Sequence, residues 1–159
     1  MILVKRLRRH VAFLRGMTAL LAGGLLASAS AQDIPQPRLP TVALTAGMHQ
    51  LVAEVASTPL QRQIGMMMRP TMAAHEAMLF VFEAATPQCF WMKNTLVALS
   101  IAFIEDDGRI VNLADMQPLT ENSHCSDKPV RYVLEVNQGW FAKRGIQPGF
   151  RLRGGPFKP

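Results

Sequence analysis

The sequence of 159 residues lacks the local motifs that identify the common enzyme classes. It contains no Gly-x-Ser-x-Gly nucleophile elbow, no His-Glu-x-x-His zinc motif, no glycine loop for phosphate and no dinucleotide fingerprint. The histidines after residue 31, which are His49, His75 and His124, do not have the spacing of zinc ligands. We therefore predict no catalytic residue, metal or cofactor from local motifs, and an enzyme assembled from scattered residues is the alternative.

A hydrophobic run long enough to span a bilayer is also missing. The longest apolar run covers residues 17–29, well short of the roughly 20 residues that a membrane-spanning helix needs. Five Lys and Arg residues precede it, and it closes on Ala29-Ser30-Ala31. This order is typical of a signal peptide, so we expect residues 1–31 to be cleaved and the remainder to be periplasmic or secreted, without stable membrane insertion. Retention of this segment as an anchor is the alternative.

Strong net charge is absent once the signal peptide is set aside. The whole chain has 17 Lys and Arg against 11 Asp and Glu, but five of the basic residues lie within residues 1–31. The remainder carries 12 basic and 11 acidic side chains, a net charge of +1, and no basic run. Because phosphates would meet no complementary surface, nucleic acid is not an expected partner.

The residues after the signal peptide are enough for one hydrophobic core, and we expect a single domain. Residues 32–40 contain three prolines and are predicted to form an extended leader. The domain itself is expected at residues 41–154, and residues 155–159 are expected to form a tail.

Short segments with alternating apolar and polar residues predict a β-rich domain. Two apolar runs flank Asp107-Gly108, a pattern that predicts a hairpin. Further strands are expected at residues 42–46, 50–57, 78–82, 90–92, 131–136 and 150–153. The predicted fold class is mainly β: a single-domain antiparallel β-sandwich or barrel-like fold with two short helices.

The two helices are expected from their end signals. Thr58 can cap a helix that has Pro59 in its first turn and Gly65 at its end. The second helix is predicted at residues 139–144, where Gly145 can adopt the left-handed conformation that ends a helix.

Cysteine is scarce, and both cysteines follow the expected signal peptide. Cys89 and Cys125 are therefore predicted to form a disulfide in an oxidising compartment. The alternative makes Cys125 a nucleophile with His124 as its base, but sequence neighbours seldom point their side chains at each other.

Several motifs, taken in order and at this spacing, resemble the DUF192 family, also called UPF0127. They are Gly65–Arg69, Met78–Phe82, Phe90–Thr95, Asp107-Gly108, and Tyr132–Val136 followed by Gly139. The resemblance covers about residues 49–153, and the Phe-Trp-Met-Lys-Asn-Thr motif is its most distinctive part. It implies a mostly β domain with short helices and implies no activity. Two positions depart from the family pattern: Ser100 stands where relatives have Asp, and Ala77 where they have Gly.

The polar residues of the central motif are candidates for a binding site. In a strand, Phe90 and Met92 would face the core, while Trp91 and Lys93 would face the other way. We hypothesise that Trp91, Lys93 and Asn94 line a pocket for a small polar or anionic ligand. The alternative is that these residues serve only the core and the strand end.

Glu135 and Arg69 complete the candidate ligand-binding set. Glu135 lies in the strand at 131–136 on the face opposite Tyr132, and a buried carboxylate there would need a partner. Arg69, Lys93 or Arg131 could provide it, and a Lys93–Glu135 pair would join two of the motifs. A solvated carboxylate is the alternative.

Methionine is abundant, and Met66, Met67, Met68 and Met72, near His75, form its densest group. Thioethers can select Cu(I), but methionine also fills cores and contact surfaces.

We therefore expect an exported binding or accessory module for a small ligand or a protein partner. The alternatives are an enzyme that uses Lys93, Asn94 and Glu135, and a methionine-based copper-binding protein.

Overall fold

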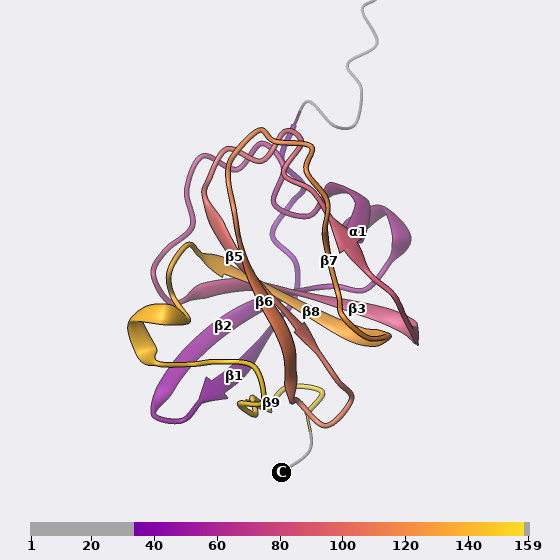
Figure 1. Ribbon diagram of the computed structural model, residues 1–159. Helices are drawn as coiled ribbons and strands as arrows, with labels where there is room; N and C mark the ends of the chain where they lie inside the picture. The colour runs from indigo at the N-terminus through magenta and orange to yellow at the C-terminus, as the bar shows by residue number, and fades with distance from the viewer. Residues whose placement is uncertain (1–33, 158–159) are drawn as a thin grey trace, which may run out of the picture.

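The computed structural model describes residues 34–157 (Figure 1). The expected signal peptide, residues 1–31, lies outside the described residues, as do residues 158–159 of the expected tail. Within the described part of the chain, no helix is long and apolar enough to cross a membrane. Residues 35–40 lead into the first strand without regular secondary structure.

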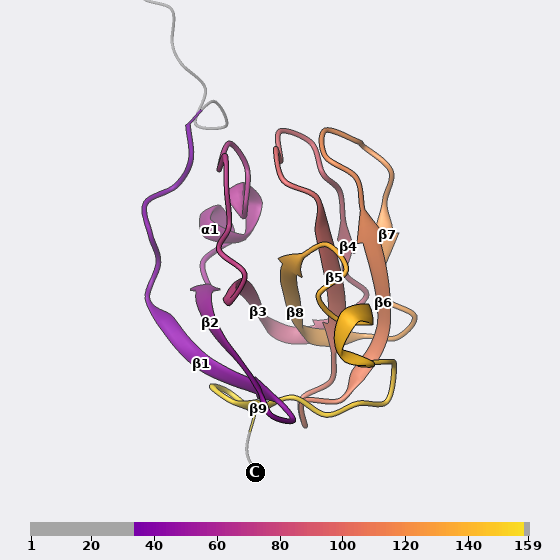
Figure 2. The ribbon, with the colours of Figure 1, turned by 90° about the vertical axis from the view of Figure 1, so that its left-hand side faces the viewer.

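A seven-stranded sheet forms the body of the domain. Its strands are β1 (Thr41–Ala46), β2 (His49–Ala56), β3 (Glu76–Thr86), β5 (Leu99–Ile104), β6 (Ile110–Met116), β8 (Val130–Asn137) and β9 (Arg153–Gly154). In space they follow the order β6, β5, β8, β3, β2, β1, β9, and the sheet is curled like half of a barrel (Figure 2). The mainly β fold class is confirmed. One pair, β2 with β3, is parallel rather than antiparallel, because a crossover through α1 (Pro59–Ile64) joins these two strands.

The C-terminal segment links the two edges of the curled sheet. On one side, Ile110 donates its backbone N–H to Phe150 and Leu152 donates to Gly108, both at 2.9 Å. On the other side, β9 pairs with β1. The expected strand at 150–153 is therefore mostly a bridging segment, since only its last residue belongs to β9.

Both faces of the sheet are buried. The first core, which we call the η1-side core, includes Leu79, Leu134, Trp140, Phe141 and Phe157 and lies next to the 3-10 helix η1 (Ala142–Arg144). The second, the α1-side core, includes Met66, Phe80, Met92, Phe103 and Val133 and lies on the opposite face. Side chains alternate between the faces along each strand, so neighbouring residues of β8 enter different cores.

The two expected helices are present, and their end signals act as expected. Thr58 accepts a hydrogen bond from the backbone of Gln61, whose side chain accepts one from Thr58 in return, and α1 ends at Gly65. The second helix is shorter than expected, because η1 is a single 3-10 turn, ended by left-handed Gly145 with φ 65°.

The predicted hairpin at Asp107-Gly108 is confirmed and joins β5 to β6. Gly108 has φ 85°, and a Cβ atom there would lie 2.4 Å from the backbone oxygen of Leu152. Only glycine fits this turn, because a larger residue would clash with the C-terminal segment.

The predicted disulfide is also confirmed. Cys89 and Cys125 are opposite each other in a small second sheet, formed by β4 (Cys89–Phe90) and β7 (His124–Cys125), with 4.1 Å between their Cα atoms. The expected strand at 90–92 is therefore shorter, and Trp91 and Met92 follow it in the connection to β5. Met92 is nevertheless buried and Trp91 is half exposed, as the alternation predicted.

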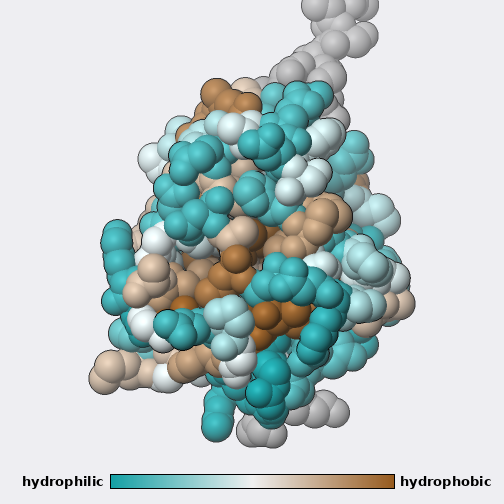
Figure 3. All heavy atoms as spheres, viewed as in Figure 1, coloured by the Kyte–Doolittle hydropathy of each residue, from teal (hydrophilic) through white to brown (hydrophobic). Residues whose placement is uncertain are grey.

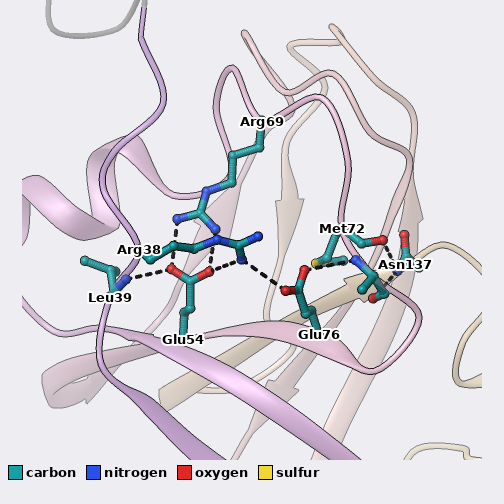
Figure 4. Close-up of polar contacts among 8 residues, drawn as sticks. Arg38, Leu39, Glu54, Arg69, Met72, Glu76 and Asn137 are labelled. Carbon is teal, nitrogen blue, oxygen red and sulfur yellow. Dashed lines mark hydrogen bonds and ion pairs between the residues drawn. The ribbon is translucent and has the colours of Figure 1, made fainter.

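A buried ion pair holds the crossover segment against the sheet (Figure 4). Arg69, in the segment that follows α1, donates two hydrogen bonds to the Glu54 carboxylate of β2, at 2.5 and 2.9 Å. Arg38 and the backbone N–H of Leu39 donate to the same carboxylate, at 2.6 and 2.8 Å. Burial alone would raise the pKa of Glu54, but these four donors outweigh it and lower the pKa to about 2.

Glu76 continues this network toward the end of β8. Its carboxylate lies 3.3 Å from Arg38 and accepts the backbone N–H of Ala73 at 2.9 Å. Asn137 donates to the carbonyl oxygens of Met72 and Ala73, each at 3.0 Å. The network therefore connects the leader, the crossover segment and three strands.

We predict that the disulfide supplies a large share of the stability of the fold. Reducing it, or replacing both cysteines by serine, should lower the free energy of unfolding by roughly 3–4 kcal/mol, since the unfolded chain is no longer constrained. Denaturant titration with and without reductant measures the loss, and the double serine variant should not respond to reductant. Two titratable thiols in the unreduced protein would contradict this.

We predict that Glu54→Gln lowers the free energy of unfolding at pH 7 by roughly 3–5 kcal/mol, because it leaves the buried Arg69 without a counter-charge. The folded-state pKa of Glu54 is depressed, so its stabilisation is present above pH 4.5 and is lost as the pH falls toward about 2. The difference in free energy of unfolding between the parent protein and Glu54→Gln should therefore shrink as the pH falls from 4.5 toward about 2.

The matched control for this change is Glu76→Gln. Its carboxylate is more exposed and contacts only Arg38 among the cations, so the expected loss is within about 1 kcal/mol. Equal losses for the two variants, measured by urea denaturation, would show that the buried pair has no special role.

Candidate functional site

A cavity of about 390 Å³ opens over the α1-side face of the sheet. One wall is formed by α1 and the Gly65–Met67 turn that follows it, and the other by β4 and Trp91. The lining residues are Pro59, Arg62, Gln63, Ile64, Gly65, Met66, Met67, Phe80, Phe82, Gln88, Cys89, Phe90, Trp91, Thr95 and Glu135. The volume lies within the range of about 300–1,000 Å³ that is typical of small-molecule sites.

Among the described residues, Glu135 is the one acidic side chain that lines this cavity. It belongs to β8 and is only 4% exposed. Among residues 34–157, no hydrogen bond or ion pair reaches its carboxyl group, and desolvation by burial raises its pKa to about 8. The group is therefore mostly protonated at neutral pH and offers an O–H donor to whatever occupies the cavity.

The register of the sheet explains why Glu135 has no cation while Glu54 has two. Glu54 is paired with Met78, and Met78 is paired with Glu135, so both glutamates lie on the same face, two strands apart. At the usual strand spacing this is a separation of about 10 Å. Arg69 and Arg38 both bind Glu54, and Met78 and Phe80 of β3 present only apolar side chains between the two carboxyl groups.

Aromatic rings and thioethers supply six of the other fourteen lining residues. Phe90 meets Phe80 edge to face, with 4.9 Å between the ring centroids, and meets Phe82 at 6.4 Å. Met66 and Met67 are buried on the opposite wall. Trp91 is 48% exposed, so part of its ring remains open to solvent.

Arg62 is the cation that lines the cavity, and its charge is already neutralised. Its guanidinium donates to the backbone oxygens of Ser57 and Val81, at 2.6 and 2.8 Å, and to the carboxylate of Glu83, at 3.0 and 3.2 Å. It also stacks over the ring of Phe82 at 4.9 Å. These contacts occupy the guanidinium with partners other than Glu135.

Two of the five candidate ligand-binding residues line the cavity. The other three, Lys93, Asn94 and Arg69, do not. Trp91 and Glu135 line the cavity together. Lys93 forms an ion pair with Glu121 at 3.7 Å and lies over the Trp91 ring at 5.4 Å. Asn94 forms a left-handed turn, with φ 58°, and its carbonyl accepts the N–H of Met68 at 2.8 Å.

The partners proposed for Glu135 are wrong. Arg69 binds Glu54, Lys93 pairs with Glu121, and Arg131 lies 3.7 Å from Asp106. The reason is that Glu54, a residue that sequence reasoning did not single out, takes the buried arginine. The hypothesis of a solvated Glu135 carboxylate is also wrong, because the side chain is buried.

The methionine group is divided between packing and the cavity. Met66 belongs to the α1-side core, Met67 is buried at the cavity wall, and Met68 has a left-handed backbone with φ 59°. His75 is exposed. Within residues 34–157 no group of three His, Cys, Asp or Glu side chains is placed to hold a metal ion.

Sequence reasoning missed several cavity residues, notably Arg62, Gln88 and the Gly65–Met67 turn as a wall. Thr95 ends the distinctive central motif and is buried in the cavity lining, so the motif itself was a usable signal for it. The others come from segments that meet only in the fold.

A second cavity, of about 450 Å³, lies between β6 and η1 on the opposite face. Figure 3 shows apolar residues in the middle of this side of the molecule, surrounded by polar ones. Two polar residues that line this second cavity, Ser100 and Asp115, are hydrogen-bonded to each other. Ser100 also accepts the N–H of Gly139 at 2.8 Å. Ser100, where the family pattern has Asp, therefore contacts a carboxylate from the neighbouring strand.

Solved structures resemble this fold, and two of them are from bacteria. A protein from Sinorhizobium meliloti 1021, provisionally described as a transcription regulator, is 37% identical, with a TM-score of 0.72 over 77% of this chain and 99% of that one. A protein of unknown function from Novosphingobium aromaticivorans DSM 12444 is 28% identical, with a TM-score of 0.67 over 79% of this chain and 98% of that one. No curated protein is detectably similar to the chain.

The sequence profile of DUF192, described as "Uncharacterized ACR", matches residues 42–154. This segment includes both walls of the cavity and the Glu135 strand. The chain therefore belongs to the DUF192 family.

Proposed function

We propose that this chain is an exported accessory domain that binds a small ligand in the cavity over Glu135. The observation that carries the proposal is a buried carboxyl group, without a partner in residues 34–157, that lines a cavity of about 390 Å³. The carboxyl group opens onto the cavity, and its oxygens have no hydrogen-bond partner among the described residues. A ligand in the cavity would supply the partner that the described part of the chain does not.

The walls suit such a ligand. They combine aromatic rings and thioethers with a few polar side chains, among them Gln88, Thr95 and Glu135, and small-molecule sites usually have this composition. The crossover wall is held by the Glu54–Arg69 pair and the opposite wall by the disulfide, so the cavity is largely formed before a ligand arrives. The disulfide also supports export, because such bonds persist in oxidising compartments.

Regulation of transcription, the provisional description of the Sinorhizobium meliloti relative, has no support in the charge of this chain. Residues 32–159 carry 12 basic and 11 acidic side chains, without a basic run. A surface of this kind does not neutralise a line of phosphates.

An enzyme is the second candidate, and one observation favours it. A carboxyl group that remains protonated near neutral pH is in the form that a general acid requires. Lys93 and Asn94, the partners first suggested for Glu135 in such a reaction, do not line the cavity. A catalytic role for Glu135 would therefore need a second catalytic group, supplied by the substrate or by another cavity residue such as Thr95.

The raised pKa of Glu135 gives a test that needs no ligand. A carboxyl whose pKa rises from 4.5 to about 8 on folding is protonated only in the folded state between these values, so stability falls as the pH rises through this range. We predict that Glu135→Gln gains stability relative to the parent protein by up to about 1.4 kcal/mol per pH unit between pH 5 and pH 8. Urea denaturation at several pH values measures the difference in free energy of unfolding between the two proteins. A difference that does not change with pH would rule out a buried protonated carboxyl.

Binding in the cavity can be tested with a fragment library followed by thermal shift. We expect fragments that stabilise the parent protein to lose their effect in Met67→Trp, in which the larger side chain fills the cavity. They should keep it in Met48→Trp, the matched control, because Met48 is 88% exposed in the turn between β1 and β2. Fragments that bind both variants equally, or a library without any binder, would contradict the proposed function.

A further inference from the structure

The electrostatics of the cavity indicate the charge of its ligand. Arg62, the cation among the described lining residues, is paired with Glu83. Lys93 and Arg131 are not lining residues, and they pair with Glu121 and Asp106. On the same face, Glu54 is bound by Arg69 and Arg38. Among the lining residues that the structure describes, the carboxyl of Glu135 is therefore the ionisable group without a partner.

The rest of the lining also favours positive charge. The faces of aromatic rings carry the negative end of their quadrupole and attract ammonium groups within about 6 Å. Phe80, Phe90 and Trp91 supply such rings, and the sulfurs of Met66 and Met67 are weak acceptors. These walls contain no free donor cation for an anionic ligand, because the guanidinium of Arg62 is used by Glu83 and two backbone carbonyls.

We propose that the ligand of this cavity is a small organic cation, an alkylated ammonium whose charge lies against the carboxylate of Glu135 while its alkyl groups contact Phe80, Phe90 and Met66. This inference rests on the proposed function and specifies its ligand class. It differs from the polar or anionic ligand that the central motif suggested, because Lys93, the cation of that hypothesis, does not line the cavity.

Binding of such a cation must release a proton. The free protein holds Glu135 as a neutral carboxylic acid, and the ammonium enters with its own charge unchanged. The O–H bond of Glu135 breaks, its proton passes to solvent, and the carboxylate and ammonium form an ion pair in the apolar cavity. No covalent bond to the ligand is formed, and charge balances because one cation replaces one proton.

Proton release makes the affinity for cations depend on pH in one direction. Below the pKa of Glu135, about 8, the cation competes with the proton for the carboxylate. The affinity of the protein for the cation should therefore increase by up to about tenfold for each unit that the pH rises. A neutral ligand that only accepts a hydrogen bond from the carboxylic acid should show a flat profile over the same range, and weaker binding above pH 8. The sign of the slope therefore separates the two ligand classes.

The experiment uses isothermal titration calorimetry with charged and neutral probes of equal shape. Choline is compared with 3,3-dimethylbutan-1-ol, its neutral carbon isostere, and tetramethylammonium and butylammonium complete the cation panel. We expect choline to bind at least about tenfold more tightly than the isostere at pH 7.5. Binding should release roughly 0.8 proton, because this is the protonated fraction of Glu135 at pH 7.5 for a pKa of about 8. Titration in buffers of different ionisation enthalpy measures the proton release in the parent protein, so the result does not depend on a variant.

Two variants show whether the dependence of cation affinity on pH arises from Glu135. Glu135→Gln should abolish both the proton release and the preference for choline over its isostere. His124 is opposite Phe90 in β7, so His124→Asn is the matched control and should keep the dependence of affinity on pH.

The outcomes distinguish this inference from the proposed function. If the neutral isostere binds as tightly as choline, or if fragments bind the cavity while no panel cation binds below about 10 mM, the cation inference is overturned and the binding function stands. If neither cations nor fragments bind, the proposed function fails as well.

Discussion

The ion pair between Glu54 and Arg69 determines how the crossover segment covers the sheet. A parallel connection between adjacent strands must cross one face of the sheet, and here it places α1 and the Gly65–Met67 turn over the α1-side core. The pair binds this segment to β2 through two hydrogen bonds between buried groups. One wall of the cavity therefore depends on an interaction that lies outside it.

Glu54 and Glu135 differ in the cations that surround them. Two carboxyl groups lie on one face of the sheet, about two strand spacings apart, and Arg69 and Arg38 both bind Glu54. Glu54 is consequently ionised, with its pKa lowered to about 2, while desolvation raises the pKa of Glu135 to about 8. The contrast arises from the placement of cations rather than from burial alone, since both side chains are buried.

The opposite wall has a different origin. The disulfide holds β4 against β7, and Phe90 and Trp91 follow directly from Cys89. This small sheet covers the edge of the α1-side core, where Phe90 packs on Phe80 and Phe103. The cavity thus lies between a segment held by charge and a segment held by a covalent bond.

The sequence by itself determined the features that depend on near neighbours. These include the hairpin at Gly108, the cap at Thr58 and the β-rich fold class. It also predicted the disulfide, because only two cysteines were available. The tertiary structure decided which charges meet: Arg69 binds Glu54 rather than Glu135, and Lys93 points to Glu121. The physical reason is that hydrogen-bonding and side-chain periodicity act over a few residues, whereas the pairing of buried charges depends on strand order and register, which bring together residues from distant parts of the chain.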